Sequence, residues 1–357
     1  MALTNGNEAN RFSIGITRDF LTASGELTYK DIGLGLIEGE PRSQYAFFSE
    51  HRTPVTPDQI AQIDAALSLG AAWKPETLAE GAERLLIVAR FGVGYDMCDV
   101  PALTANNVLL TITRGATDLP VAGGILGMML ALSRRLFIKD RLVREGRWQE
   151  RAHYQGTDIS GKVLGIVGFG GQGRELRRLV EPFGMKVIAY DPYVSDEALR
   201  AQGVEGVATL EALFEQSDYV SIHCLLNDQT KGLIHRDLFR LMKPTAYFLN
   251  AARGPIVNEK DLIEALQSAS IAGAGIDVFE QEPPSPDNPL LQMENVILAP
   301  HSVCWTEECF QAMGDLAVRS ILSVMRGEVP FGLLNPEVLE QKGFLAKREA
   351  MLARLKG

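Results

Sequence analysis

The sequence predicts an α/β fold built around a doubly wound parallel sheet, and three observations lead to that prediction. Short apolar segments typical of buried strands alternate with segments of helical pattern from about Gly115 to about Pro300. One apolar segment runs directly into a G-x-G-x-x-G motif. The next apolar segment ends at an aspartate, and sheets of this kind bind their ligands beyond the carboxyl ends of the strands.

The glycine motif lies between a predicted strand and a predicted helix. Val163–Val167 is short, apolar and rich in branched side chains, which indicates a buried parallel strand. Gly168, Gly170 and Gly173 follow it, and glycine permits both a tight turn and a close approach of a pyrophosphate to the backbone. We expect a helix over residues 174–183, with its amino end facing the phosphates.

The aspartate at the end of the next predicted strand indicates which dinucleotide is bound. Asp191 follows the segment MKVIAY and lies 18 residues beyond Gly173. Its carboxylate can accept hydrogen bonds from the adenosine ribose and would repel a 2′-phosphate, so the sequence predicts NAD rather than NADP. The alternatives are a purely structural glycine turn and a solvated turn aspartate before Pro192. The predicted strand, helix and acid in this order favour the dinucleotide site.

Further apolar segments complete the predicted sheet. Strands are expected in DYVSIHC, AYFLN, GAGIDVF and NVILAP, and a helix in DLIEALQSAS. The segment LPVAGGILGMMLALS, which begins at Leu119, is too short to span a bilayer comfortably and is interpreted as a buried helix. His223, inside DYVSIHC, is interpreted as a hydrogen-bonded core residue.

Three ionisable residues follow three of these strands. Arg253, Glu282 and His301 would therefore meet at one edge of the sheet. A guanidinium can bind a substrate carboxylate through two hydrogen bonds, and an imidazole can exchange a proton near neutral pH. A neighbouring carboxylate favours the charged imidazole. Each residue also has an ordinary interpretation, as a helix cap, a loop residue or a turn histidine, but their joint placement favours reduction of a 2-keto acid.

Composition excludes several classes of protein. The 357 residues include 35 Lys and Arg against 45 Asp and Glu, so the net charge of −10 argues against nonspecific binding of nucleic acid or anionic membranes. The N-terminus shows no secretory signal. The four cysteines form no C-x-x-C pair or Cys/His cluster, which predicts reduced cysteines in a cytoplasmic protein and no metal site.

Seven motifs are spread over nearly the whole length of the chain, namely RFGVGYD, GFGGQG, DYVSIHC, NAARGPIV, AGIDVFEQEP, APH and LLNPEV. By these motifs and their order, the chain resembles the D-isomer-specific 2-hydroxyacid dehydrogenases. The resemblance implies an enzyme that interconverts a 2-keto acid and a D-2-hydroxy acid by hydride transfer with NAD. In this enzyme Arg253 would bind the substrate, and Glu282 and His301 would form the acid–base pair.

The resemblance also implies further contacts with substrate and cofactor. The amides of Val93 and Gly94 would bind the substrate carboxylate beside Arg253, and Asp277 would contact the nicotinamide carboxamide. The complete set of expected cofactor contacts is Gly168, Gly170, Gln172, Gly173, Asp191, Leu225, Thr230, Ala251 and Asp277.

The domain organisation implied by the resemblance explains why 160 residues precede the nucleotide segment. A Rossmann NAD-binding domain, residues 114–307, would be inserted into a discontinuous flavodoxin-like substrate domain formed by residues 9–113 and 308–357. A homodimer is expected on the same ground.

Several positions depart from the family's pattern. Gly171-Gln172 replaces the usual pair inside the glycine motif, and Met97, Arg114 and Gly123 stand where Asn, Pro and Glu are common. The segment LSLGAAWKPETL also lacks the family's polar loop. The substrate-facing loops are therefore unusual, and the candidates for specificity are Trp73, Lys74, Arg114 and Trp305.

The sequence leaves alternatives for the function open. A NAD-sensing regulatory protein on the same scaffold is the main one, although such a protein would need no proton shuttle. Phosphoglycerate oxidation is not favoured, because no phosphate-binding cluster is evident and no regulatory domain follows Lys356. The residues identified recognise a head group common to glyoxylate, hydroxypyruvate, branched keto acids and sugar-derived keto acids.

Overall fold

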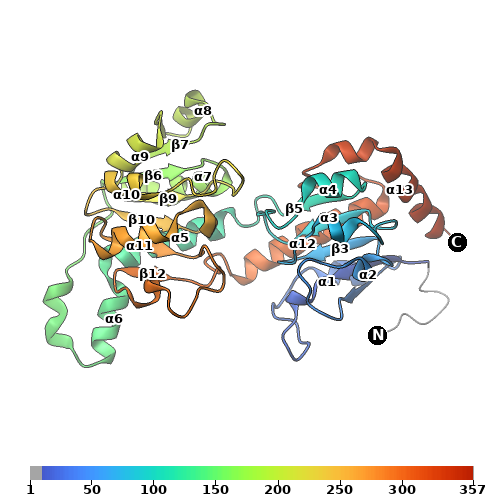
Figure 1. Cartoon of the computed structure of the whole chain (residues 1–357), viewed down its shortest axis with the longest axis horizontal. Coiled ribbons are helices and arrows are strands. Elements are labelled where there is room, and N and C mark those ends of the chain that lie inside the picture. The colour runs from blue at the N-terminus through green and yellow to red at the C-terminus, as the bar shows by residue number, and fades with distance from the viewer. Residues whose placement is uncertain (1–9, 357) are drawn as a thin grey trace. The chain divides into compact units, whose positions relative to one another are not determined.

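The computed structural model describes residues 10–356, which form two compact units (Figure 1). The inserted unit is Asp118–Trp305. The split unit consists of the described residues up to Thr117 together with those from Thr306 onward. The chain thus passes between the units at Thr117/Asp118 and at Trp305/Thr306, where the sequence analysis placed the domain boundaries at 113/114 and 307/308.

A seven-stranded parallel sheet forms the centre of the inserted unit. Its strand order is β12-β11-β10-β9-β6-β7-β8. This is the dinucleotide-binding order 3-2-1-4-5-6 with one strand added at the edge. The strands are β6 (Val163–Val167), β7 (Lys186–Tyr190), β8 (Glu205–Gly206), β9 (Tyr219–Ile222), β10 (Tyr247–Asn250), β11 (Gly273–Ile276) and β12 (Val296–Leu298).

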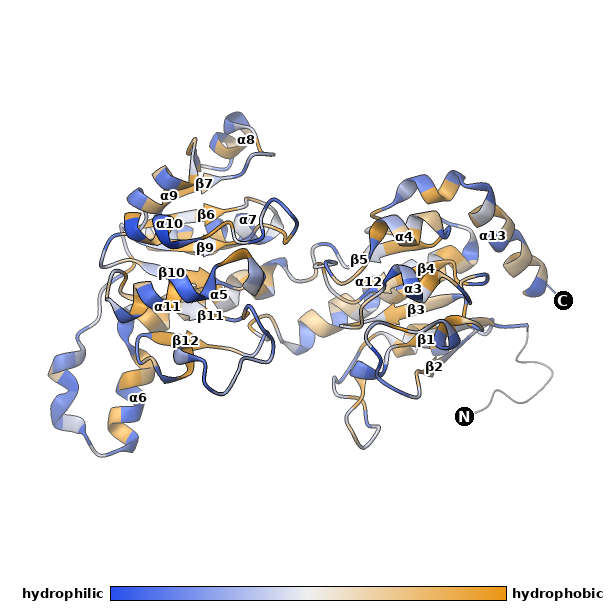
Figure 2. Cartoon of the chain, viewed as in Figure 1, coloured by the Kyte–Doolittle hydropathy of each residue, from blue (hydrophilic) through white to orange (hydrophobic). Residues whose placement is uncertain are grey.

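Helices cover both faces of this sheet. Successive residues of each strand point to opposite faces, so each strand contributes side chains to both helix layers. Tyr247 and Leu249 pack with α5 and α7, whereas Phe248 packs with α9, α10 and α11. The apolar strands between more polar outer helix faces are visible in Figure 2. The helices are α5 (Asp118–Arg134), α6 (Leu136–Arg144), α7 (Gly171–Val180), α8 (Asp196–Ala201), α9 (Leu210–Gln216), α10 (Arg236–Leu241) and α11 (Glu259–Gln267).

The helix after the glycine motif differs from the prediction at both ends. It was expected over residues 174–183, but α7 begins at Gly171, and Glu181–Phe183 is a separate 3-10 turn. Glycine is a poor helix former, so its presence masked the start. Packing overrides this preference, because a Cβ at Gly173 would lie only 2.9 Å from the carbonyl oxygen of Gly168. The helix can approach the strand this closely only with glycine there.

The segment predicted as a buried helix is α5. Its inner face, including Val121, Ile125 and Met129, is buried, although Leu119 is exposed. Taken over residues 10–356, no single helix combines the length and apolar character needed to cross a membrane. Only α5 and α6 taken together are long and apolar enough, and they are bent by 62° at their junction.

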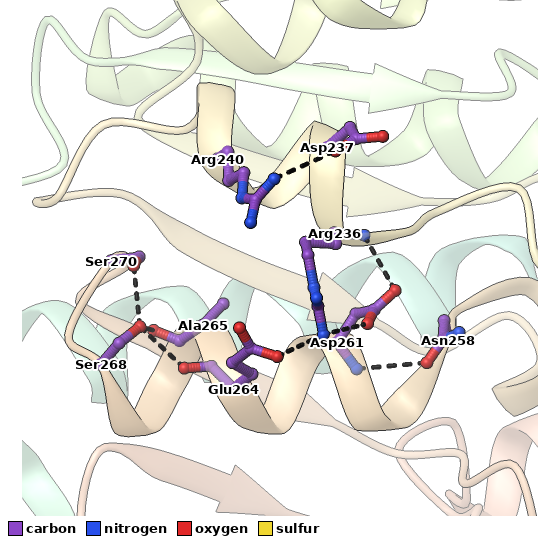
Figure 3. Close-up of polar contacts among 9 residues, drawn as sticks. All are labelled: Arg236, Asp237, Arg240, Asn258, Asp261, Glu264, Ala265, Ser268 and Ser270. Carbon is purple, nitrogen blue, oxygen red and sulfur yellow. Dashed lines mark hydrogen bonds and ion pairs between the residues drawn. The ribbon is translucent and has the colours of Figure 1, made fainter.

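A polar network joins α10 to α11 on the opposite face (Figure 3). The backbone N–H of Arg236 donates to Asp261 Oδ2 at 3.0 Å, and the Arg236 guanidinium bonds both Asp261 and Glu264. Since α11 follows the Arg253 loop, this network holds the start of α11 and thereby supports that loop.

The split unit contains a second parallel sheet, of order β2-β1-β3-β4-β5, which is the flavodoxin-like order. Its strands are β1 (Phe12–Ile16), β2 (Ser43–Phe47), β3 (Ala65–Ser68), β4 (Ile87–Arg90) and β5 (Leu109–Ile112). Its helices are α1 (Leu34–Glu38), α2 (Pro57–Ile60), α3 (Pro75–Leu78), α4 (Val100–Ala105), α12 (Glu307–Arg326) and α13 (Lys342–Arg354).

The C-terminal helices belong firmly to this unit. α12 packs on β3, β4 and β5. On α13, Lys347 Nζ donates to the carbonyl oxygens of Ala82 and Asn106 at 2.7 Å each and to that of Leu85 at 3.2 Å. Burial lowers the pKa of Lys347 to about 8. The three carbonyls thus fix α13 to loops far from it in the sequence.

Candidate active site

Arg253, Glu282 and His301 follow β10, β11 and β12, which are neighbouring strands. The structure brings Glu282 and His301 into direct contact, because His301 Nδ1 donates to Glu282 Oε2 at 2.8 Å. Both side chains remain partly exposed. With Nδ1 committed to the carboxylate, Nε2 is the ring nitrogen left for a substrate.

The surroundings of Glu282 keep its carboxyl group ionised. Partial burial alone would raise its pKa, but the hydrogen bond and charge of His301, the Phe279 N–H and the charge of Arg253 together lower the pKa of Glu282. The Phe279 N–H donates to Glu282 Oε1 at 3.1 Å, so each carboxylate oxygen has its own donor. All three ionisable residues are therefore electrostatically linked.

The loop that carries Arg253 is packed directly on the loop that carries Glu282. A Cβ at Gly254 would collide with the carbonyl group of Phe279, so only glycine fits there. Arg253 Nη1 donates to the Ala252 carbonyl at 2.8 Å, and Asn250 Nδ2 donates to the Arg253 carbonyl at 3.0 Å. These contacts fix the backbone from which the guanidinium extends.

His301 has a left-handed backbone, with φ at 51°, which is uncommon for a residue other than glycine. Asp277 stabilises this turn. The carbonyl oxygen of Asp277 accepts the His301 N–H at 2.7 Å, and its Oδ1 accepts the N–H groups of Ser302 at 2.7 Å and Val303 at 3.0 Å. Burial raises the pKa of Asp277 more than these amides and His301 lower it.

This positioning role of Asp277 was missed in the sequence analysis, which assigned it only a cofactor contact. The aspartate at the end of GAGID was visible, but its partners lie about 25 residues further along the chain. No spacing rule links an acid to backbone amides at that separation.

The glycine motif lies where β6 and β9 are adjacent, the switch point of the sheet. Gly168 has φ at 90°, and a Cβ there would lie 2.7 Å from the backbone nitrogen of Cys224. Gly170 is the N-cap of α7, and a Cβ built on it would meet no atom within 4 Å. The amino end of α7 therefore faces open space beside Gly170.

Asp191 lies beside this turn. Its Oδ2 accepts the Phe169 N–H at 2.7 Å, and its Oδ1 accepts the Tyr193 N–H at 2.9 Å. A carboxylate has about four acceptor positions, so each oxygen can accept one further hydrogen bond. The acid is thus held at the edge of the glycine turn and can still bind a hydroxyl group.

Gln172 and His223 interact beside the glycine motif. His223 Nδ1 donates to Gln172 Oε1 at 3.5 Å, and Ser221 Oγ donates to His223 Nε2 at 2.9 Å. Burial lowers the pKa of His223 to about 4, so the imidazole is neutral at physiological pH. The predicted hydrogen bonding of His223 is confirmed, and the residue is partly buried at the edge of the core.

The other expected cofactor contacts lie in loops at the same edge. Thr230 Oγ1 donates to the Leu225 carbonyl at 2.5 Å and accepts the Asn227 N–H at 2.8 Å, so it fixes the loop that follows β9. Leu225 is exposed on this loop. Ala251 follows β10 directly and is partly buried.

In the split unit, Val93 and Gly94 lie in the loop after β4, with Val93 partly exposed and Gly94 buried. Among the candidates for specificity, Trp73 is fully buried and donates from Nε1 to Ser68 Oγ at 2.9 Å, so it is a core residue. Arg114 and Trp305 are exposed. Within residues 10–356 no three His, Cys, Asp or Glu side chains are arranged to hold a metal ion.

Comparisons with known proteins agree on one family. The sequence model for the D-isomer specific 2-hydroxyacid dehydrogenase, NAD binding domain, matches residues 126–302, which lie within the inserted unit. A glyoxylate reductase of Korarchaeum cryptofilum is 39% identical over 286 residues, covering 79% of this chain and 86% of the relative. A D-3-phosphoglycerate dehydrogenase of Methanocaldococcus jannaschii is 37% identical, covering 84% of this chain but 57% of the relative.

Among solved structures, a putative D-isomer specific 2-hydroxyacid dehydrogenase from Polaromonas superposes with a TM-score of 0.78 at 26% identity. The match covers 91% of this chain and 99% of that one, and so includes both units.

Proposed function

The chain belongs to the D-isomer specific 2-hydroxyacid dehydrogenase family, and we propose that Arg253, Glu282 and His301 are the residues that perform its catalysis. The family's reaction is the NAD-dependent interconversion of a 2-keto acid and a D-2-hydroxy acid. The observation that supports our assignment is the Glu282–His301 contact, within reach of the charge of Arg253.

The residues around the glycine turn fit NAD. The space beside Gly170 accepts a pyrophosphate at the amino end of α7, where unpaired N–H groups and the helix dipole favour an anion. Asp191 would bind the adenosine ribose, and the loops holding Gln172, Leu225, Thr230 and Ala251 would line the remainder. Bound NADH supplies the hydride for the carbonyl carbon. Asp277 would contact the carboxamide in addition to its structural role.

The side chains would bind the charged substrate and transfer the proton. Arg253 would bind the substrate carboxylate through a planar pair of hydrogen bonds, with the amides of Val93 and Gly94 as further donors. In the reductive direction His301 Nε2 gives its proton to the carbonyl oxygen as hydride reaches the carbon. The Glu282 carboxylate then faces a neutral imidazole, which regains a proton from solvent. Oxidation of the hydroxy acid reverses these transfers.

The split unit would serve as the substrate-binding domain. The test of the whole proposal is NADH oxidation by the full chain with a panel of 2-keto acids, starting with glyoxylate because relatives are named glyoxylate reductase. Hydroxypyruvate, branched keto acids and phosphohydroxypyruvate complete the panel. NAD binding without turnover of any panel member would support a NAD-sensing regulatory protein instead.

A homodimer and a cytoplasmic location are part of the proposal. Large apolar side chains are exposed on α6 and the segment after it, among them Phe137 at 64% and Trp148 at 57%, and a second copy would cover them. Four free cysteines are consistent with a reducing compartment. The net charge of −10 argues against a nucleic-acid or anionic-membrane partner. Sedimentation of the wild type tests the dimer, and Phe137→Ser tests this surface; a wild type with the mass of one chain would contradict the dimer, and an unchanged dimer in the variant would contradict the surface.

A further inference from the structure

At Gly171 the chain departs from the family's pattern, and an acidic residue from another helix lies against this glycine. A Cβ on Gly171 would collide with Oδ2 of Asp118 and would lie 2.5 Å from its carboxyl carbon. Asp118 is the first residue of α5, which packs along α7. The carboxylate of Asp118 therefore fills the space that a side chain at position 171 would take.

This carboxylate lies at the amino end of α7. Gly171 is the first residue of α7, and its N-cap, Gly170, provides no side-chain hydrogen bond. The open space beside Gly170 is where the pyrophosphate would approach. A carboxylate at this helix end and a pyrophosphate bound there would repel each other. Both would also interact with the same positive end of the helix dipole.

The charge of Asp118 is poorly compensated. Burial raises the pKa of Asp118, and the nearby Glu175 carboxylate raises it further. In the part of the chain that the structure describes, Asp118 takes part in no ion pair, whereas Glu175 is paired with Arg178 at 2.8 Å. The carboxylates of Asp118 and Glu175 thus both add negative charge near the glycine motif.

We propose that Asp118 sets the affinity for the cofactor, by holding a carboxylate against the pyrophosphate and so weakening its binding. This inference rests on the proposed binding of NAD at the glycine motif. Weaker binding of the phosphates would speed cofactor exchange after each turnover. The residues that transfer the proton would not change.

The experiment is calorimetric titration of the full chain with NAD, ADP and adenosine at low salt. Asp118→Asn should tighten NAD and ADP by about 4- to 300-fold, the range for one charge at a separation of about 5 Å and effective dielectric constants between those of water and a protein surface. Adenosine, which carries no phosphate, should bind unchanged. The gain should shrink as salt is added.

Two further variants separate charge from shape. Asp118→Ser removes the same charge with a different side chain and should change affinity in the same direction. Asp140→Asn is the matched control, since it removes an acid from α6 that is paired with Arg144 and should leave all three affinities unchanged. Thermal unfolding confirms that each variant is folded.

Unchanged NAD affinity in a folded Asp118→Asn variant would overturn the inference, as would an equal change for adenosine. Failure of the wild type to bind NAD at all would instead overturn the proposed function, and this inference with it.

Discussion

The two ends of the carboxyl edge of the large sheet use charge in opposite ways. At the acid–base end, formed by the loops after β10, β11 and β12, Glu282 is paired with His301 and lies within the field of Arg253. At the phosphate end, formed by the glycine turn and α7, Asp191 accepts hydrogen bonds from backbone amides and the Asp118 carboxylate lies against Gly171, and among the described residues neither acid is paired with a cation. At the acid–base end the charged side chains pair with one another. At the phosphate end there is open space in which a ligand can bind.

Packing differs in the same way. At the acid–base end a single added Cβ, at Gly254, would collide with the neighbouring loop. At the phosphate end a Cβ at Gly168 or Gly171 would also collide, but at Gly170, where the pyrophosphate would approach, it would meet nothing within 4 Å. Proton transfer needs groups held at fixed distances, while a pyrophosphate needs an unobstructed approach to amides. Substitutions at the two ends should therefore fail for different reasons.

The largest effect should follow from removing the cation. Arg253→Ala should lower kcat/KM by about 10²–10⁴-fold, because two charge-assisted hydrogen bonds are each worth about 1.5–3 kcal/mol. NAD affinity should change little. The field of Arg253 lowers the pKa of Glu282, so the acid limb of the pH profile should also move to higher pH. Steady-state kinetics and NAD titration measure these effects, and Arg253→Lys should recover only part. Wild-type efficiency in Arg253→Ala would contradict the assignment.

A pair of glycine substitutions contrasts the two ends directly. Gly254→Ala forces the Arg253 and Glu282 loops apart, so it should cost about 1–3 kcal/mol of stability, as overpacking does, and roughly 10²-fold in kcat/KM. Gly170→Ala, the matched control, should leave the unfolding free energy unchanged and weaken NAD. Chemical denaturation and kinetics separate them. Equal loss of stability in both would remove the distinction between the two ends.

The acid–base pair predicts a pH-dependent effect of intermediate size. Glu282→Gln removes the carboxylate that favours the charged imidazole, so the alkaline limb of kcat/KM for keto-acid reduction should move to lower pH. The loss near neutral pH should be smaller than the ~10²–10⁴-fold contributed by a whole general acid. In the wild type the pKa of Glu282 is lowered, so the pair persists through mildly acid pH and is lost only below the ordinary carboxyl range. An unchanged profile with full activity would make Glu282 a loop residue.

Sequence patterns were sufficient for six of the seven strands of the large sheet, with β8 missed, and for the positions of the residues that follow them. Val163–Val167 is apolar and branched on both faces, as a strand buried under two layers of helices must be, and Asp191 follows its neighbour. The start of α7 was wrong because intrinsic preference disfavours Gly171 and Gly173, while the close approach of helix and strand requires glycine at position 173.

Contacts between distant segments could not be predicted. The departure at Gly171 was visible, but that Asp118 fills the vacated space depends on how α5 packs against α7. The same holds for Gly254 against Phe279 and for Asp277 beneath His301. In each case the decisive partner lies on another element, and a single sequence read by itself carries no signal for the pairing.

The smallest effect, and the sharpest test of the phosphate end, concerns the choice of cofactor. Asp191 is held by the amides of Phe169 and Tyr193 and should both bind the ribose of NAD and repel a 2′-phosphate. Asp191→Ser should weaken NAD roughly tenfold, near the lower limit for a charged hydrogen bond. It should also narrow the preference for NAD over NADP, but strong NADP binding should not appear, because residues 192–199 contain no Lys or Arg to receive the phosphate. The two acids at this end are therefore expected to act in opposite directions on NAD: loss of Asp118 tightens it, and loss of Asp191 loosens it. Measuring kcat/KM with both cofactors decides the matter; a wild type that prefers NADP, or a ratio untouched by the substitution, would show that Asp191 does not contact the ribose.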